Sequence, residues 1–417
     1  MAQKETIWSF SYFALLIMNF VGGMGQMVGG TILPLYARDL GVTAGTVGII
    51  VGAFAISALA IRPFAGPAMD SFPKKPLLLG SFLIMCITTL LYPLATNVVL
   101  LFLVRFFYGL GLGCTGPLGL AMVAELVPMS RLASGISIYA LSYSVSQAIG
   151  PAFGLWCKDA VGYNPTFLLS GALIGVSCIL IALMKFPERD NRPPFQLKLD
   201  RMVSKEALIP TAIVFLLAIS FTCTGAFMAI YGELRGIAEI GLYFTVYAVC
   251  LLATRPVFGR IADTKGVSTV LIPAILAFAL SYILVGFAGD LPLFLVAAAV
   301  AACGYGVASP LVQSVMVKVV PDERRGAGSN TMYFGIDAAN LVGPVIGGFV
   351  IELLIPISGS EVAAYSNMWF VMLIPIAFAL VFYLMTRERL QHLQEATRKA
   401  DLVAKSQIKK QTPDLDD

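Results

Sequence analysis

Apolar residues gather into twelve long stretches that short polar segments separate. Each stretch is close to the ~20 residues that a helix needs to cross the ~30 Å apolar core of a bilayer. The first six lie near residues 9–36, 45–69, 76–95, 98–124, 132–156 and 165–186. The second six lie near 208–231, 240–262, 268–288, 291–317, 327–354 and 364–386. The pattern predicts an all-α membrane protein with twelve transmembrane helices.

The two groups of six stretches repeat each other in one register, in which Arg62 corresponds to Arg255. The other matched pairs are Gly66/Gly259, Asp70/Asp263, Gly111/Gly304, Pro117/Pro310, Arg131/Arg324, Gly150/Gly343, Pro151/Pro344 and Gly154/Gly347. A membrane repeat in the same direction implies two bundles related by an axis along the membrane normal. We expect two pseudo-symmetric six-helix bundles with a site between them, which is the architecture of a transporter.

The polar segments divide the chain into four parts. Residues 1–186 form the predicted first bundle and 207–386 the second. Residues 187–206, which are charged and contain prolines, form a linker, and 387–417 form a tail that begins as a helix. A polar tail of this composition is expected to become disordered toward its end.

The distribution of basic residues predicts the orientation in the membrane. If the N-terminus is cytoplasmic, only Arg38, Lys158 and Arg235 of the 28 Lys and Arg residues fall in outer loops. Arg62, Arg105 and Arg255 fall within helices, and the remainder lie on the inner side. Because positive residues concentrate in cytoplasmic loops, both termini are expected in the cytoplasm. No cleavable signal pattern precedes the first helix, and we expect a multi-pass protein of a bacterial cytoplasmic membrane.

Composition excludes several classes of function. Apolar residues make up 58% of the chain and charged residues 12%, against about 25% in soluble domains. The net charge of +4 follows the topology and does not indicate nucleic-acid binding. The seven cysteines form no CxxC pair, the only histidine is His392 in the tail, and no phosphate-binding loop is present. We therefore expect no catalytic residues, no metal and no cofactor.

Two segments that follow the Arg-Pro pairs resemble the best-known signature of the major facilitator superfamily. The family pattern is Gly-x-x-x-Asp-(Arg/Lys)-x-Gly-(Arg/Lys)-(Arg/Lys). The first copy here runs from Gly66 through Asp70 to Lys74-Lys75, with Ser71 and Pro73 in place of the first basic residue and the later glycine. The second runs from Gly259 through Asp263 to Gly266 and lacks the final basic pair.

The resemblance implies a gating role for these loops at the cytoplasmic face. Gly66 and Gly259 would allow close helix contact. A network like that of the family would join Asp70 to Glu125 and Arg131, and Asp263 is the repeat counterpart of Asp70. The alternative is an ordinary capped turn.

Two further segments resemble family motifs. Arg105-Phe-Phe-Tyr108-Gly109 resembles the motif of the fourth helix, with Tyr108 where a polar amide is common. A charge at this depth is costly and normally faces protein or water, so Arg105 is expected to pair with an acid or to bind an anionic group. Gly150-Pro151 and Gly343-Pro344 resemble the helix-kink motif of the twelve-helix drug:proton antiporters, which favours export. A kink that serves only packing would leave the same trace in an importer.

The predicted eleventh helix carries the strongest candidate site. Asn330, Tyr333, Asp337 and Asn340 share one helix face, and Asp337 lies ~15 Å along the axis, near the bilayer centre. An unpaired carboxylate there is costly, so Asp337 is a candidate proton carrier or cation site. The alternative is an acid that is held statically by neighbouring helices.

Other polar residues are expected to converge on the same centre. The fifth helix presents Ser144 and Gln147, the repeat counterparts of Asp337 and Asn340. Asn19 and Gln26 come from the first helix, and Gln313 comes from the tenth. The resemblance implies that helices 1, 4, 5, 7, 10 and 11 line the cavity.

The sequence thus predicts a secondary transporter that works by alternating access, is monomeric, and has a small molecule, protons and the lipid bilayer as its partners. The preferred hypothesis is proton-coupled efflux of a small organic or amphipathic compound. One alternative is a proton symporter or facilitator that imports a sugar or organic acid. Another is a membrane receptor or lipid-handling protein that transports no solute.

Overall fold

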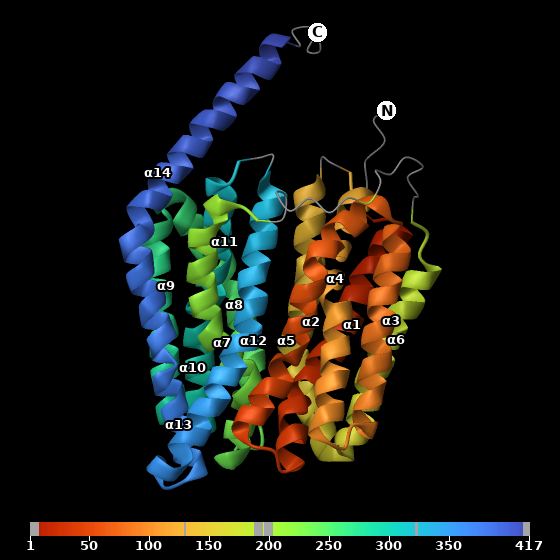
Figure 1. Ribbon diagram of the computed structural model, residues 1–417, viewed down its shortest axis with the longest axis vertical. Coiled ribbons are helices and arrows are strands. Elements are labelled where there is room, and N and C mark those ends of the chain that lie inside the picture. The colour runs from red at the N-terminus through yellow and green to blue at the C-terminus, as the bar shows by residue number, and fades with distance from the viewer. Residues whose placement is uncertain (1–7, 129–130, 187–194, 196–202, 322–323, 412–417) are drawn as a thin grey trace.

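The computed structural model describes residues 8–128, 131–186, 195, 203–321 and 324–411, without the side chains of Asp70, Ala133 and 398–411. Helices account for nearly all of this part of the chain, arranged as two adjacent bundles (Figure 1). The first bundle contains α1 (Phe10–Asp39), α2 (Ala44–Ser71), α3 (Lys74–Leu91), the 3-10 turn η1 (Tyr92–Leu94), α4 (Val98–Leu126), α5 (Leu132–Val161) and α6 (Tyr163–Leu183).

The second bundle begins after the 3-10 turn η4 (Lys205–Ala207). Its helices are α7 (Leu208–Leu234), α8 (Leu242–Lys265), α9 (Val267–Phe287), α10 (Leu291–Cys303), α11 (Tyr305–Val319), α12 (Arg325–Ser358), α13 (Glu361–Val371) and α14 (Leu373–Gln411). Every predicted apolar stretch coincides with one helix or with two consecutive helices, and the predicted all-α membrane fold is confirmed. The tail helix extends to Gln411, beyond the membrane-length part of α14.

Two of the predicted transmembrane helices are divided. The stretch predicted at 291–317 consists of α10 and α11, which are separated at Gly304, where the backbone leaves helical geometry (φ −83°, ψ −100°). Gly304 packs directly on α9, because a Cβ atom there would lie 2.5 Å from the Cα and N atoms of Phe278. Helix α4 stays continuous through the repeat counterpart, Gly111. The second division, between α13 and α14, falls at Met372.

Eleven helical segments of the described chain are long and apolar enough to cross a membrane. The twelfth pass, α5, has the length but lower hydropathy, because serines and a glutamine interrupt its apolar surface. These are Ser134, Ser137, Ser142, Ser144, Ser146 and Gln147. A membrane helix with such a polar stripe is expected to turn it toward protein or a cavity.

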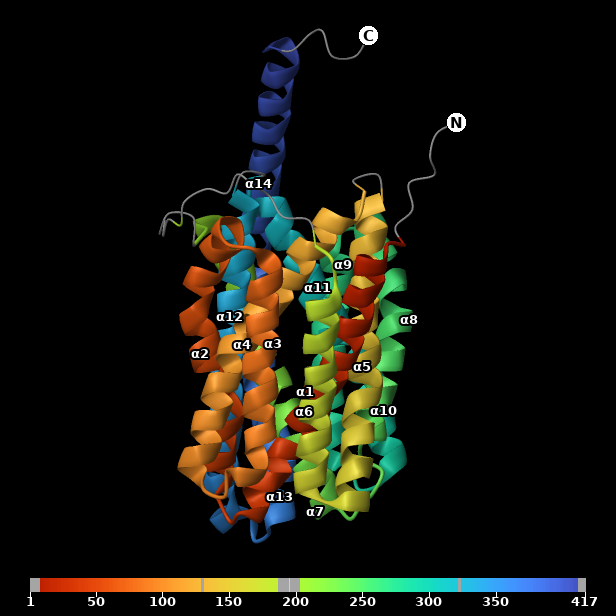
Figure 2. The ribbon, with the colours of Figure 1, turned by 90° about the vertical axis from the view of Figure 1, so that its right-hand side faces the viewer.

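The first half and the second half of the chain meet along two main helix pairs, α2 with α12 and α5 with α8, and α1 also contacts α7. Figure 2, in which the first half faces the viewer, shows these two pairs at opposite edges of the bundle. We call the end at which α1 begins and the long α14 projects the termini end, and the opposite end the far end (Figure 1).

Ion pairs join the two halves at the far end. Arg38 of α1 lies 3.9 Å from Glu233 of α7 and 3.4 Å from Glu361 of α13. Lys158 of α5 also pairs with Glu233. On α2, the backbone N–H of Gly45 donates to Oε1 of Glu352 on α12 at 3.0 Å. These contacts close the far end between the halves.

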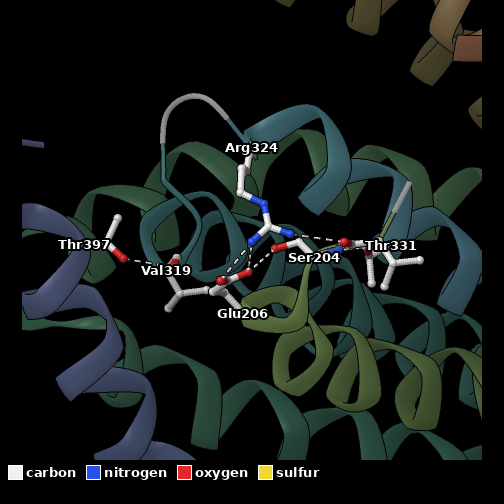
Figure 3. A network of polar contacts seen from close by, with 7 residues as sticks. Ser204, Glu206, Val319, Arg324, Thr331 and Thr397 are labelled. Carbon is white, nitrogen blue, oxygen red and sulfur yellow. Dashed lines mark hydrogen bonds and ion pairs between the residues drawn. The ribbon is translucent and has the colours of Figure 1, made fainter. Parts of the chain in front are cut away.

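At the termini end, a polar network fixes the residues that precede α7 to the start of α12 (Figure 3). The Arg324 guanidinium donates to Glu206 at 3.2 Å and to the carbonyl of Val203 at 3.3 Å. The backbone N–H of Ser204 donates to the Thr331 hydroxyl at 2.9 Å. The last residues of the predicted linker are therefore part of the second half's packing.

Candidate functional site

A buried ion pair between Arg62 of α2 and Asp337 of α12 crosses the boundary between the two halves. The side chains are only 10% and 8% exposed. The Arg62 guanidinium also lies over the ring of Tyr333, 4.8 Å from its centroid. Because an opposite charge accompanies it, the carboxylate is tolerated at this depth. The sequence prediction that Asp337 and Tyr333 share one helix face agrees with this arrangement.

The packing of α2 on α12 explains how the two charges meet. Nearer the far end, Gly48 lies against the carbonyl of Pro344, and Gly52 lies against Leu341. The same antiparallel register would bring Arg62 level with residues close to Thr331, about 9 Å from Asp337 along the axis. Side chains on a helix lean toward its N-terminus. Helix α2 begins at the far end and α12 begins at the termini end. The side chains of Arg62 and Asp337 therefore lean toward each other and span the offset between their backbone positions.

Arg105 does not contact Asp337, whose partner is Arg62. Of the two roles predicted for Arg105, pairing with an acid is not seen among the described residues in this conformation, and binding of an anionic group stays a prediction. Its Nε donates to the carbonyl of Val51 at 3.4 Å, and its guanidinium lies over the rings of Phe54 and Tyr108, at 4.8 and 5.1 Å. Arg105 is 8% exposed, and in the described part of the chain no carboxylate pairs with it. It lies in the far-end half of α4, whereas Arg62 lies well toward the termini end of α2.

A pocket of about 220 Å³ opens beside the ion pair, between α11 and α12. Tyr333 belongs to both features, because its ring contacts Arg62 and lines the pocket. The remaining lining is a mixture of amide, hydroxyl, thioether and aliphatic groups, from Gln313, Ser314, Met316, Val317, Ser329, Met332 and Ile336. Such a wall suits a small molecule with an apolar body and a few polar groups.

The two polar residues predicted on the first helix bind groups of α5 other than the predicted Ser144 and Gln147. The Asn19 side chain donates to the Tyr139 carbonyl at 3.0 Å and to the Ser142 hydroxyl at 2.9 Å. Gln26 accepts from the Tyr143 hydroxyl at 3.4 Å. These bonds attach α1 to α5, so both side chains have a structural role in this conformation.

The other predicted site residues differ in exposure. Ser144 is buried and donates to the carbonyl of Ala140 in its own helix at 3.1 Å. Gln147 is exposed, and Asn340 is half-buried three residues beyond Asp337. Gln313 donates to the Ser309 hydroxyl at 3.4 Å within α11 and lines the pocket.

The candidate gating residues at the termini end are only partly connected. Glu125 forms an ion pair with Lys74 at 2.7 Å, and both residues belong to the first half. Arg131 is exposed at the start of α5, Asp263 is exposed on α8, and the Asp70 side chain lies outside the described residues. The part of the predicted network that joins Asp70 to Glu125 and Arg131 therefore stays a prediction.

Gly66 and Gly259 do not make the close helix contacts that the motif predicts. A Cβ atom at either position would have no heavy atom within 4 Å. The contact glycines lie elsewhere. A Cβ at Gly154 would lie 3.0 Å from the Val28 Cα on α1, and a Cβ at Gly347 would lie 2.8 Å from the Cys223 sulfur on α7.

The Gly-Pro pairs occupy equivalent positions in the two halves. Gly150 packs against Met27, so that α5 lies close to α1, and Gly343 packs against Ile219 and Thr222, so that α12 lies close to α7. Pro151 and Pro344 both lie inside continuous helices. Within the residues that the structure describes, no three His, Cys, Asp or Glu side chains cluster as metal ligands would.

Two repeated membrane bundles that meet at a buried charged site define a membrane transport protein. A sequence model of the Major Facilitator Superfamily matches residues 15–232 and again residues 210–413. The chain belongs to this superfamily and is a transporter of that type, not an enzyme.

Relatives and solved structures agree with this assignment. The chain is 23% identical to an uncharacterized MFS-type transporter of Methanocaldococcus jannaschii over 82% of its own length and 91% of the relative's. It is 22% identical to the quinolone resistance protein NorA of Staphylococcus aureus, covering 79% and 87% of the two chains.

Among solved structures, a bacterial homolog of the human lysosomal transporter Spinster, in an inward-facing and unoccupied conformation, superposes with a TM-score of 0.78. The identity is 13%, and 94% of this chain and 99% of that chain are covered. The nucleoside transporter NupG superposes with a TM-score of 0.73 at 14% identity, covering 92% and 98% of the two chains. These likenesses show the fold.

Proposed function

We propose that this protein is a proton-coupled exporter of a small organic, amphipathic compound, and that it works by alternating access. The observation that carries the proposal is Asp337, a buried carboxylate in a membrane helix whose counter-ion, Arg62, belongs to the other half. A proton or a substrate cation that binds Asp337 changes a contact between the halves. Binding and reorientation are therefore linked at one pair of residues.

The rest of the proposal concerns topology. The concentration of basic residues in the loops of the termini end supports a cytoplasmic location for that end, in a bacterial cell, and an outer location for the far end. The ion pairs of Arg38 and Lys158 then close the outer side, and the pocket beside Tyr333 lies on the cytoplasmic side of these pairs. We propose that the protein acts as a monomer composed of the bundles 1–186 and 207–386, with the linker 187–206 and the tail 387–417 on the inner side.

We propose that the loops at the cytoplasmic side act as a gate in the opposite conformation. Glu125 already pairs with Lys74, and Asp70, Arg131 and Asp263 lie on the same side of the membrane. Gly66 and Gly259 have free space around them in the present conformation. When the cytoplasmic side closes, the absence of a side chain at these two glycines would allow neighbouring helices to approach closely.

The resemblance to a quinolone resistance protein supports export. A second candidate, proton symport of an organic anion, is favoured by one observation: protonation of Asp337 would leave the buried Arg62 without its counter-ion. An anion that bound Arg62 would then enter together with the proton. The sign of the proton change on ligand binding separates the two mechanisms.

The test is proton exchange by the purified, detergent-solubilised protein in weakly buffered solution, over a series of pH values. The probes are tetraphenylphosphonium, a zwitterionic quinolone, uridine and benzoate. We expect proton release when a transported probe with a cationic group binds, and no release in Asp337→Asn. Proton uptake with benzoate would support the symporter. Probes that bind without any proton change in either protein would contradict coupling through Asp337.

Transport in proteoliposomes completes the test. An inward proton gradient should drive the active probe out of the cytoplasmic side, and Asp337→Asn should abolish the gradient dependence. Arg255→Gln is the matched control, since Arg255 occupies the repeat position of Arg62 but is exposed. Its transport should equal that of the wild-type protein.

A further inference from the structure

The two charges of the Arg62–Asp337 site, which we call the central site, belong to different halves of the chain. The positive group, Arg62, is on α2, and the negative group, Asp337, is on α12, and each is about nine-tenths buried. The repeat counterparts do not reproduce the pair, because Ser144 stands at the position of Asp337 and Arg255 is exposed. One buried, neutral pair of opposite charges is thus the electrostatic feature that any ligand of this site must meet.

The charge of a ligand decides whether its binding leaves a buried residue of this site without a counter-ion. A cation that binds Asp337 displaces Arg62 and leaves its guanidinium without a carboxylate. An anion that binds Arg62 leaves Asp337 without a cation. A buried charge that loses its partner costs about 3–5 kcal/mol. A molecule that carries both an ammonium and an acidic group can satisfy both residues at once.

Building on the proton-coupled export proposed above, we infer that the transported compounds are small amphipathic zwitterions. Their ammonium group binds Asp337 and their acidic group binds Arg62, so that the substrate replaces one ion pair with two. Because these residues belong to different halves, the bound zwitterion connects α2 and α12. The apolar body of the ligand occupies the adjoining pocket, where Tyr333, Met316, Met332 and Ile336 supply apolar surface.

The dimensions of the pocket limit the size of this body. Its volume of about 220 Å³ is below the ~300–1,000 Å³ that is typical of pockets for drug-sized ligands. An aromatic or short aliphatic group fills such a space. The amide of Gln313 and the hydroxyls of Ser314 and Ser329 can bind one or two additional polar atoms.

Competition with protons follows from the same geometry. A proton on Asp337 removes the negative charge that the ammonium group requires, so the proton and the zwitterion exclude each other, as antiport demands. The charged and titratable groups described around this carboxylate are Arg62 of α2 and Tyr333 of α12, and Cys114 of α4 lies within electrostatic range of Arg62. A neutral phenol and thiol leave the charge balance of the pair unchanged.

Two matched sets of probes test the inference by calorimetric binding to the full-length protein in detergent. One set is phenylalanine, its ethyl ester and its N-acetyl derivative. The other is a piperazine-bearing quinolone acid, its ethyl ester and its N-acetyl derivative. Each set compares a zwitterion with a cation and an anion of nearly the same shape. In at least one set, we expect the zwitterion to bind at least about tenfold more tightly than both analogues, a difference of ~1.4 kcal/mol.

Variants connect this preference to the two residues. In Arg62→Gln/Asp337→Asn, which removes both charges without leaving one unpaired, the advantage of the zwitterion should disappear. In Arg255→Gln it should persist. A wild-type protein in which neither zwitterion binds more tightly than its two analogues would overturn the inference, and so would an advantage that survives in the double variant. Proton coupling is measured separately, by the proton-exchange experiment described above. A preference for the zwitterion without proton release would contradict only the export mechanism.

Discussion

Lys158, near the end of α5, forms an ion pair with Glu233, in the last turn of α7, and so joins the two halves at the far end. Glu233 also lies near Arg38 of α1. Glu233→Gln removes the carboxylate that Arg38 and Lys158 share and leaves each of them one other acidic partner, Glu361 and Asp159 respectively. The side chains are 13–31% exposed, so we expect a modest loss of about 1 kcal/mol. The far end should open more often, by about fivefold.

Cysteine labelling measures this opening. A second pocket, of about 290 Å³, lies at the far end and is lined by Arg38, Glu361 and Val47 among others. Val47→Cys introduces a thiol at this fully buried position. An impermeant maleimide should label it faster in the Glu233→Gln background. Asp159→Asn is the control, because Asp159 pairs with Lys158 within one half. Equal labelling rates in both backgrounds would show that these ion pairs do not hold the far end closed.

Gly48 and Gly66, both on α2, should respond in opposite ways to alanine. A Cβ at Gly48 would lie 2.7 Å from the carbonyl carbon of Pro344 and 3.1 Å from the Val345 Cα, so Gly48→Ala forces α2 away from α12. We expect a loss of about 1–3 kcal/mol. Gly66→Ala meets no heavy atom within 4 Å and should be neutral or stabilising by up to about 1 kcal/mol. Thermal unfolding in detergent compares the two.

Gly66→Ala also tests the proposed gate. If α2 approaches another helix at Gly66 when the termini end closes, the variant should keep its thermal stability and transport more slowly. Wild-type transport rates in Gly66→Ala would remove Gly66 from the gate. A stable Gly48→Ala would show that α2 and α12 can separate without cost.

Removing one partner of the central ion pair should cost more than removing both. Asp337→Asn leaves the Arg62 guanidinium buried without a carboxylate, and we expect a loss of about 3–5 kcal/mol. Arg62→Gln/Asp337→Asn leaves no charge and should recover most of this loss. A thermal unfolding series with both single variants and the double variant gives the coupling between the residues. Additive effects would mean that the two charges do not stabilise each other.

The sequence predicts the helices well because their apolar stretches exceed membrane length and recur in both halves. The position of Asp337 near the bilayer centre, which follows from helix rise alone, stays a prediction. The partner of Asp337 does not follow, since Arg62 and Arg105 are both charges inside apolar helices. Only the register of α2 on α12, set where Gly48 meets Pro344, selects Arg62.

Other differences also arise from packing that a single sequence does not display. The interruption at Gly304 depends on its contact with Phe278 of α9, whereas Gly111 has the same place in the repeat and leaves α4 intact. The free space around Gly66 and Gly259 belongs to one conformation of a protein that is expected to adopt at least two. The family motif must suit every conformation of the transport cycle. It can therefore predict helix contacts at Gly66 and Gly259 that the present conformation lacks.

Arg105 is the residue for which stability and transport are expected to change in opposite directions. Its guanidinium is buried between α2 and α4 and is satisfied by one long hydrogen bond and two aromatic rings, without a carboxylate in the described chain. Cation–π contacts contribute about 0.5–2 kcal/mol, less than the cost of an unpaired buried charge. Arg105→Met, which retains much of the volume, should therefore raise the unfolding temperature while lowering transport, as at other functional sites that sacrifice stability. Arg105→Lys is the control that keeps the charge and loses the planar stacking. A methionine variant that is less stable and still transports normally would identify Arg105 as a packing residue.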